Sequence, residues 1–175
     1  LGYKYEEATD EPKFSYNGIV LVRRDNCDAL KDVVSDLCKR LLVLDVEGAI
    51  DGLRVAIDNL VEGRVPLDKL TITKTLSDGY KNPEQIAHWV LAQRIGRRDP
   101  AKKPRSNDRI AYAFVVVKDP KALQGDRIET PEHITDNGLE LDYVYYLEHQ
   151  IVTPVCQILA AAVERVPGYR LAADH

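Results

Sequence analysis

The sequence contains no methionine, one tryptophan, two phenylalanines and three cysteines among its 175 residues. It also has no apolar run that approaches the ~20 residues needed to span a bilayer, and residues 1–5 do not form a signal peptide. These absences argue against a membrane partner. Because Met is missing even at position 1, we expect the chain to be a piece of a longer protein.

Motifs for metal binding and catalysis are missing as well. No Cys-x-x-Cys pair, HExxH, Gly-x-Ser-x-Gly, P-loop or Gly-x-Gly-x-x-Gly occurs, and the four histidines are scattered. The spacing of Cys27, Cys38 and Cys156 fits neither a zinc site nor a disulfide framework, which favours free buried thiols and an intracellular compartment. A free-standing enzyme is therefore the least favoured reading, and we expect no metal or cofactor within this chain.

The composition is that of a soluble globular protein, with 45% hydrophobic and 30% charged residues. The length fits one domain, or one domain with a small appendage. A net charge of −4 argues weakly against a nucleic-acid partner, although the distribution of charge matters more than its sum.

Hydrophobic periodicity predicts a fold that is mainly α with minor β. Apolar residues recur every three or four positions in 28–44, 46–61, 83–97 and 142–166, with Asn26 as the expected N-cap of the first helix and a kink at Pro154. The first two helices are expected to pack antiparallel. Short β segments are predicted at the N-terminus, where a hairpin with an acidic connection precedes residue 25, at 70–76 and at 110–117, and a short helical turn at 130–137.

Basic residues form a cluster on this acidic chain. The segment 97–109 joins the third helix to the strand at 110–117, and further basic residues lie outside it. The cluster comprises Arg97, Arg98, Lys102, Lys103, Arg105 and Arg109, and the outlying residues are Arg23, Arg24, Lys74 and Arg94. Two readings stay open: solvated cations, some of them near a helix C-terminus, or a surface that follows the phosphates of a nucleic acid. Tyr145 and Tyr146 are candidates either for base stacking or for the core.

Five blocks of the sequence resemble, in order, the C-terminal part of family-B DNA polymerases of the delta type and of large DNA viruses. The blocks are GIVLVRRDNC (18–27), LTITKTL (70–76), AHWVLAQRIGRRDP (87–100), NDRIAYAFV (107–115) and LDYVYYLEHQIVTPVCQIL (141–159). The resemblance implies that residues 1–25 end the palm domain and that 26–175 form the helical thumb, which grips primer–template duplex. The catalytic aspartates and their Mg²⁺ would lie in the missing palm, so this chain is not expected to polymerise DNA alone.

Carried over to this sequence, the resemblance implies DNA contacts through sugar and phosphate. The best matches are Lys74, Arg94, Arg98, Arg109 and Tyr112, with Arg23 and Arg24 at the palm–thumb junction and Lys102, Lys103 and Arg105 in the basic loop. Where the family has Gly before the Asp/Glu-Arg pair, Asn107 stands here, and Asn tolerates a left-handed backbone.

The resemblance also implies partners. These are the primer–template duplex and the rest of the polymerase, namely its palm and fingers. A sliding-clamp processivity factor is left open as a further partner. The expected location is the nucleus or a cytoplasmic site of viral replication. The alternative is a free-standing helical module that docks a partner subunit. The acidic segment EEATDE and the negative net charge fit this alternative better than they fit DNA binding.

Overall fold

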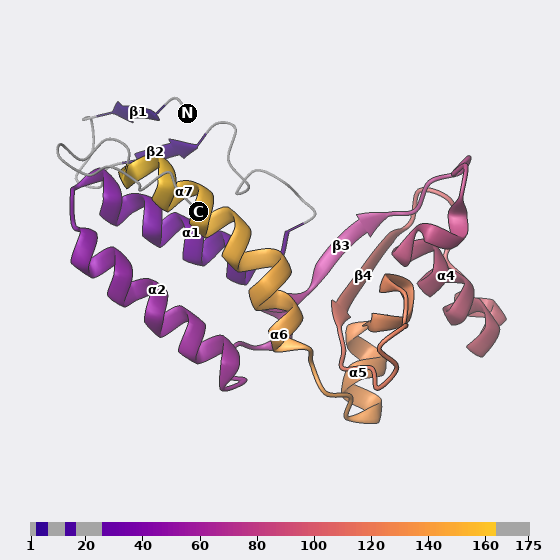
Figure 1. The fold of residues 1–175 in the computed structure, drawn as a ribbon. Helices are drawn as coiled ribbons and strands as arrows, with labels where there is room; N and C mark the ends of the chain where they lie inside the picture. The colour runs from indigo at the N-terminus through magenta and orange to yellow at the C-terminus, as the bar shows by residue number, and fades with distance from the viewer. Residues whose placement is uncertain (1–2, 7–12, 17–25, 164–175) are drawn as a thin grey trace.

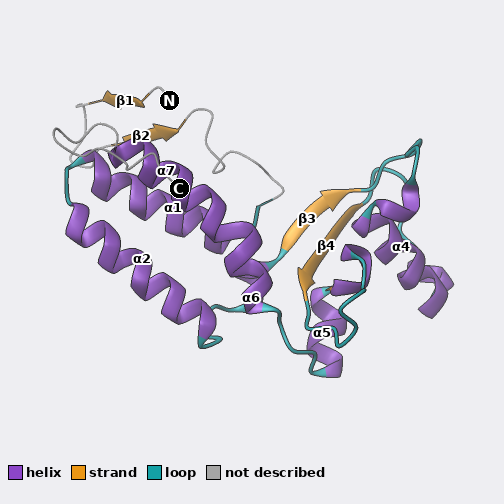
Figure 2. Cartoon of the chain, viewed as in Figure 1, coloured by secondary structure: helices purple, strands orange, loops and turns teal. Residues whose placement is uncertain are grey.

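The computed structural model describes residues 3–6, 13–16 and 26–163 (Figure 1). Two parts adjoin one another. One is built from long helices, and the other places short helices beside a small sheet (Figure 2). The predicted class, mainly α with minor β, is confirmed. Within the described residues, no helix has the length and apolar character required to cross a membrane.

The helical part is formed by α1 (Asp28–Leu42), α2 (Val46–Val61) and the last helix of the described chain. Leu30, Val34, Leu37 and Cys38 recur at helical spacing and are the buried residues of α1. The predicted N-cap is wrong, because Cys27 occupies that position and no side chain caps the helix. Between the two helices Leu44 adopts φ 61°, a left-handed conformation that is rare for leucine.

The last helix contains an irregular segment directly before Pro154. It consists of α6 (Tyr143–Tyr146), a π-helical segment (Leu147–Val152) and α7 (Thr153–Val163). Proline has no backbone N–H and crowds the preceding turn, and a wider π turn is one way in which a helix accommodates it. The π segment lies immediately before the proline at which the sequence predicts a kink.

The second part is organised on a three-stranded antiparallel sheet in the order β3 (Ile72–Thr75), β4 (Arg109–Phe114) and β5 (Ile128–Glu129). The strand predicted at 110–117 ends earlier, at Phe114, after which Val115 forms an isolated bridge with Leu141. Around the sheet lie α3 (Leu67–Leu70), α4 (Ala87–Arg98) and α5 (Pro131–Asn137). Separately, β1 (Tyr3–Glu6) and β2 (Lys13–Tyr16) pair antiparallel, as the predicted hairpin requires.

Two helix ends follow ordinary capping rules. Thr130 accepts a hydrogen bond from the His133 amide to begin α5, and Gly138 ends it at φ 59°.

The start of α4 differs from the prediction. Pro83–Gln85 forms one 3₁₀ turn, Ile86 is extended, and the α-helix begins only at Ala87. The shift places His88 in the first turn of α4.

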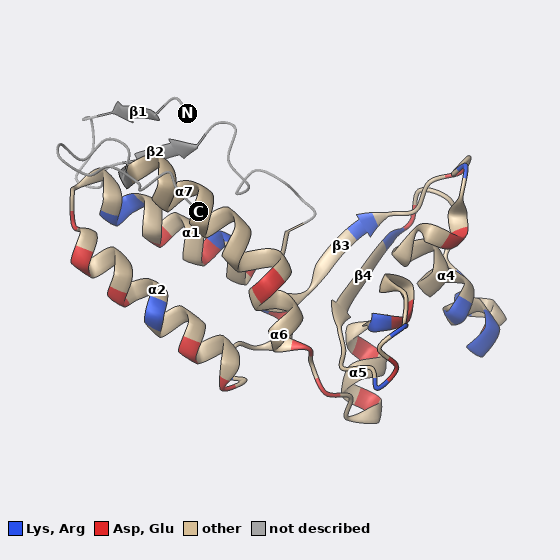
Figure 3. Ribbon diagram, viewed as in Figure 1, with Lys and Arg blue, Asp and Glu red and all other residues tan. Residues whose placement is uncertain are grey.

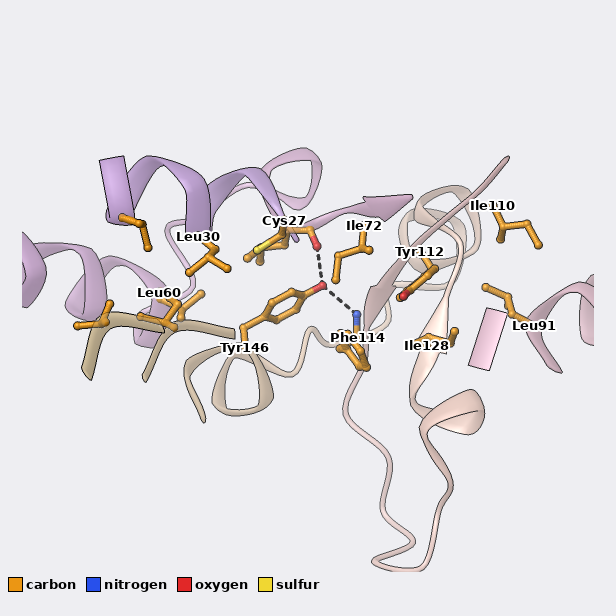
Figure 4. Close-up of a cluster of buried hydrophobic side chains, with 14 of the residues drawn as sticks. Cys27, Leu30, Leu60, Ile72, Leu91, Ile110, Tyr112, Phe114, Ile128 and Tyr146 are labelled. Carbon is orange, nitrogen blue, oxygen red and sulfur yellow. Dashed lines mark hydrogen bonds between the residues drawn. The ribbon is translucent and has the colours of Figure 1, made fainter. Parts of the chain in front are cut away.

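One hydrophobic core runs through both parts (Figure 4). It contains residues of α1 and α2, such as Leu30 and Leu60, together with residues of the sheet and α4, such as Ile72 and Leu91. Tyr146 lies at the junction and is 0% exposed. Because the helices and the sheet share this core, the position of the sheet is fixed relative to the helices.

Candidate nucleic-acid interface

The sheet brings Lys74 and Arg109 to the same end of neighbouring strands. In the antiparallel register Lys74 lies opposite Ile110, and Thr75 lies opposite Arg109. Strand β3 is at the edge of the sheet, so one flank of its backbone is not paired within the sheet. Figure 3 shows Lys and Arg on β3, at the start of β4 and at the end of α4. Residues 35 positions apart in the sequence therefore meet at one site.

A pocket of about 550 Å³ lies at this end of the sheet. Its lining comes from β3, β4, α4 and the segment that follows β3, and comprises Thr73, Lys74, Thr75, Ser77, Tyr80, His88 and Arg109. Two of these residues are cationic, and none of them is Asp or Glu. Hydroxyl, imidazole and cationic groups without a carboxylate favour an anionic ligand such as a phosphate.

The loop that follows α4 is held against that helix. Asp99 accepts a hydrogen bond from the Ala101 amide and begins the 3₁₀ turn Pro100–Lys102. The stem of Lys103 packs over Gly96, where an added Cβ would come within 2.7 Å of the lysine Cγ. The predicted basic loop is therefore anchored to α4 by its own lysine stem.

The turn before β4 confirms the expectation for Asn107. Its φ is 70°, in the left-handed region. Its amide donates to the Leu76 carbonyl at 2.8 Å, and the Leu76 amide donates to the Asp108 carbonyl at 2.8 Å. The paired segment of β3 and β4 thus extends beyond Thr75, and the direction of Arg109 is set by this turn.

Arg94 and Arg98 converge on one buried carboxylate. Arg98 donates to both oxygens of Glu129 at 3.0 and 2.5 Å, and Arg94 Nε lies 3.0 Å from Oε1. Arg94 also donates to the Gly125 carbonyl at 3.0 Å and to the Ile128 carbonyl. The side chains of Arg94, Arg98 and Glu129 are 20%, 39% and 7% exposed. The guanidinium groups therefore fix β5 to α4, and Arg98 keeps the greater access to solvent.

Opposing effects act on the pKa of Glu129. Burial alone would raise the pKa, but the hydrogen bond from Arg98 and the charges of Arg94 and Arg98 hold it below its usual value. The carboxylate stays ionised and satisfied at neutral pH.

The other predicted residues lie in different surroundings. Tyr112 is buried in the core, Lys102, Lys103, Arg105 and Arg109 are exposed, and Arg23 and Arg24 lie outside the described residues. Tyr145 is stacked between Phe114, at 4.0 Å, and His149, at 4.1 Å, and Tyr146 is fully buried. Neither tyrosine presents an open ring face for a nucleobase. Of the cysteines, Cys27 and Cys38 are free and buried as expected, but Cys156 is free and exposed.

Sequence reasoning missed Tyr80, His88 and Glu129. The acidic Glu129 follows Ile128 in a short β segment, and no local pattern links it to Arg98 and Arg94, which lie 31 and 35 positions earlier. His88 did have one signal, its place in the AHWVLAQR block, where it is the second residue of α4. In the described part of the chain, no three His, Cys, Asp or Glu side chains are arranged to hold a metal ion.

Known proteins with a similar fold and a similar sequence identify the family of this chain. A family-B DNA polymerase from the archaeon Pyrobaculum calidifontis has a similar fold, with a TM-score of 0.57 and 20% identity, over 84% of this chain and 18% of the archaeal chain. Residues 1–162 match the sequence profile of DNA polymerase family B. The chain therefore belongs to DNA polymerase family B.

Relatives with higher sequence identity are viral and delta-type enzymes. The DNA polymerase of Acanthamoeba polyphaga mimivirus is 44% identical over 91% of this chain and 10% of its own length. That of Pyramimonas orientalis virus is 40% identical over 95% of this chain and 14% of its own length. The DNA polymerase delta catalytic subunit of Glycine max is 34% identical over 93% and 15%. The chain thus spans between a tenth and a seventh of the length of these relatives.

Proposed function

We propose that this chain is the thumb of a family-B DNA-directed DNA polymerase, preceded by the end of the palm in residues 1–25, and that it holds primer–template duplex by sugar–phosphate contacts. The observation that carries the proposal is the pocket beside Lys74 and Arg109, which has cations and hydroxyls but no carboxylate in its lining. Contacts of this kind position a duplex without reading its sequence.

The basic groups beyond the pocket support the same role. Lys102, Lys103 and Arg105 extend the positive charge past the end of α4, and the Lys103 stem is braced on Gly96. Arg98 retains solvent access while paired with Glu129, so it contributes charge to this edge, whereas Arg94 has the carbonyls of Gly125 and Ile128 and the Glu129 carboxylate as its partners. Among the predicted contacts, Lys74, Arg109 and the basic loop are therefore the strongest.

In the proposed parent enzyme, nucleotidyl transfer takes place in the palm, where carboxylates bind Mg²⁺. This chain would contribute duplex binding, with the palm and the fingers as its intramolecular partners and a sliding clamp as an additional one. The parent would act at an intracellular site of DNA replication, nuclear or viral.

Salt dependence of duplex binding tests the proposal. With about five phosphate contacts, log affinity should fall with log salt concentration with a slope near −4.5. Fluorescence anisotropy of a labelled primer–template duplex, measured with the polymerase that carries this chain and with the chain itself, gives the slope. An affinity that does not change with salt contradicts duplex holding through phosphates.

A second candidate function is docking of a protein partner. It is favoured by exposed apolar residues at the turn between α1 and α2, where Leu44 is 83% exposed and Val43 is 70% exposed. Exposed apolar clusters of this kind often mark protein contacts. Stable co-purification of a partner without DNA, abolished by Leu44→Asp, supports this function; co-purification that the substitution leaves intact contradicts it.

A further inference from the structure

Tyr80 and His88 form a hydrogen-bonded pair in the wall of the cationic pocket. The Tyr80 hydroxyl oxygen lies 2.9 Å from His88 Nε2, and the two rings meet edge to face at 5.9 Å. The same oxygen accepts a hydrogen bond from the Ser77 amide at 3.0 Å. Both residues are half-buried and line the pocket together with Lys74 and Arg109.

The hydrogen bonds of this pair fit a neutral imidazole that accepts from Tyr80. The Ser77 amide can only donate, so it occupies one lone pair of the Tyr80 oxygen; the other lone pair could accept from a protonated Nε2, and we assign the hydroxyl proton to His88 Nε2 as the arrangement that suits a neutral ring. The ring also has a hydrogen-bond interaction with the Thr75 backbone that favours its protonated form. In this assignment the free pocket holds a neutral imidazole with its proton on Nδ1.

The charges around His88 explain why the ring is neutral. Burial lowers its pKa, the positive charge of Lys74 on β3 lowers it further, and the hydrogen bond to Thr75 opposes them in part. Arg109 on β4 is the second cation of the lining, Tyr80 is the titratable group from the preceding segment, and no other residue of α4 lines the pocket. An anion in the pocket would reverse this balance.

We propose that a backbone phosphate of the duplex enters this pocket beside Lys74 and Arg109, and that His88 takes up a proton when it does. This inference rests on the duplex-holding function proposed above and goes beyond it by assigning roles to Tyr80 and His88. The pocket, at about 550 Å³, has room for a phosphodiester group and part of its sugar.

Proton uptake would reverse the hydrogen bond between the two side chains. A proton from solvent binds His88 Nε2, which then donates to the Tyr80 oxygen in place of accepting from it. The Tyr80 oxygen keeps its second lone pair for the Ser77 amide. The Tyr80 hydroxyl proton, which no longer points at His88, can then donate to a phosphate oxygen. One proton thus adds both a positive charge and a hydrogen-bond donor to the site. His88 acts as a positioning residue through Tyr80.

Proton uptake on binding can be measured directly. Isothermal titration calorimetry of the polymerase with a primer–template duplex, in two buffers of different ionisation enthalpy at neutral pH, reports the protons bound. We expect uptake by the wild type that is lost in His88→Gln and reduced in Tyr80→Phe. His149→Gln, which changes a histidine on the final helix that stacks on Tyr145, is the matched control and should keep the uptake.

Affinity should follow the same linkage. A rise of one unit in the pKa of His88 on binding increases wild-type affinity by up to about tenfold as the pH falls from about 8 to about 6. His88→Gln should show a weaker increase. Wild-type binding that follows salt but takes up no proton overturns this inference alone, without requiring any variant to fold. A pH dependence that is the same in the wild type and His88→Gln also overturns it. Binding that is independent of salt overturns the duplex-holding function and this inference with it.

Discussion

The Tyr146 hydroxyl donates a hydrogen bond of 2.6 Å to the Leu70 carbonyl, which lies 76 positions earlier in the chain. The same hydroxyl accepts from the Phe114 amide at 3.0 Å (Figure 4). Leu70 ends α3 just before β3, and Phe114 ends β4, so one side chain of the final helix holds both strands. Burial raises the pKa of Tyr146 well above its ordinary value, so the hydroxyl keeps its proton.

Tyr146→Phe should lower the free energy of unfolding by about 1–3 kcal/mol, because it leaves a buried carbonyl without its donor and a buried amide without its acceptor. Urea denaturation followed by circular dichroism measures the change. Tyr145→Phe is the matched control, since its hydroxyl accepts a solvent-exposed hydrogen bond from the Gln124 side chain, and should change stability by about 0.5 kcal/mol or less. Equal losses in both variants would contradict the role of Tyr146.

The Glu129 carboxylate should make the free energy of unfolding depend on pH in the acidic range. Its pKa is lowered in the folded state by Arg98 and Arg94 despite burial, so its contribution is present above the unfolded pKa of about 4.3 and is lost as the pH falls through the lower folded value. Glu129→Gln should be less stable at neutral pH and should lose less stability than the wild type on acidification below about pH 4.5. Thermal melts over a pH series test this, and parallel curves for the two proteins would refute it.

Arg94 and Lys102 are expected to separate stability from DNA binding. Arg94→Ala removes the donor to two carbonyls and one partner of a buried carboxylate, so we expect a loss of about 2–4 kcal/mol in unfolding free energy. Lys102→Ala, at an exposed position in the 3₁₀ turn, should leave stability within about 0.5 kcal/mol and lower duplex affinity. Denaturation and anisotropy on the same samples provide the comparison. A stable Arg94→Ala protein would show that the network with Glu129 is dispensable.

The helices were predictable because their determinants are local, but their faces only in part: Val46, Ile50 and Val61 share the apolar spacing of α2 and are exposed. In α1, the burial of Leu30, Val34, Leu37 and Cys38 follows directly from their spacing in the sequence. The left-handed Asn107 was predictable for the same reason, since a single residue sets the turn. The start of α4 was not, because Pro83 is equally suited to an α-helix and to the 3₁₀ turn that it forms.

The candidate site depends on contacts that no local pattern encodes. The strand register brings Lys74 next to Arg109, and the late start of α4 at Ala87 brings His88 to Tyr80. The sequence marked Arg94 and Arg98 as basic residues of equal standing, but the carboxylate that pairs with both comes from a strand of two residues far along the chain. The positive charge of Arg94 and Arg98 was visible in the sequence, whereas their pairing with Glu129 could be seen only in the folded structure.

Lys74 and Arg109 are expected to contribute separately to duplex binding. The double variant Lys74→Ala/Arg109→Ala should weaken binding at least roughly 100-fold at low salt, because hydrogen bonds from charged donors contribute about 1.5–3 kcal/mol each and two are lost. It should also reduce the steepness of the salt dependence by about 1.8, at ~0.9 for each lost phosphate contact. Fluorescence anisotropy over a salt series measures both quantities.

Lys69→Ala is the control for general loss of charge in these measurements. Lys69 is a lysine of α3 that pairs with Asp32 on α1 at 2.7 Å, away from the residues that line the pocket. It removes one positive charge from the protein without touching the pocket, so the slope should stay at the wild-type value. If Lys69→Ala lowers the slope by the ~0.9 expected for one lost phosphate contact, the protein attracts DNA by its overall charge and the pocket is not a specific phosphate site. If only the pocket variants lower it, the two phosphate contacts lie at Lys74 and Arg109.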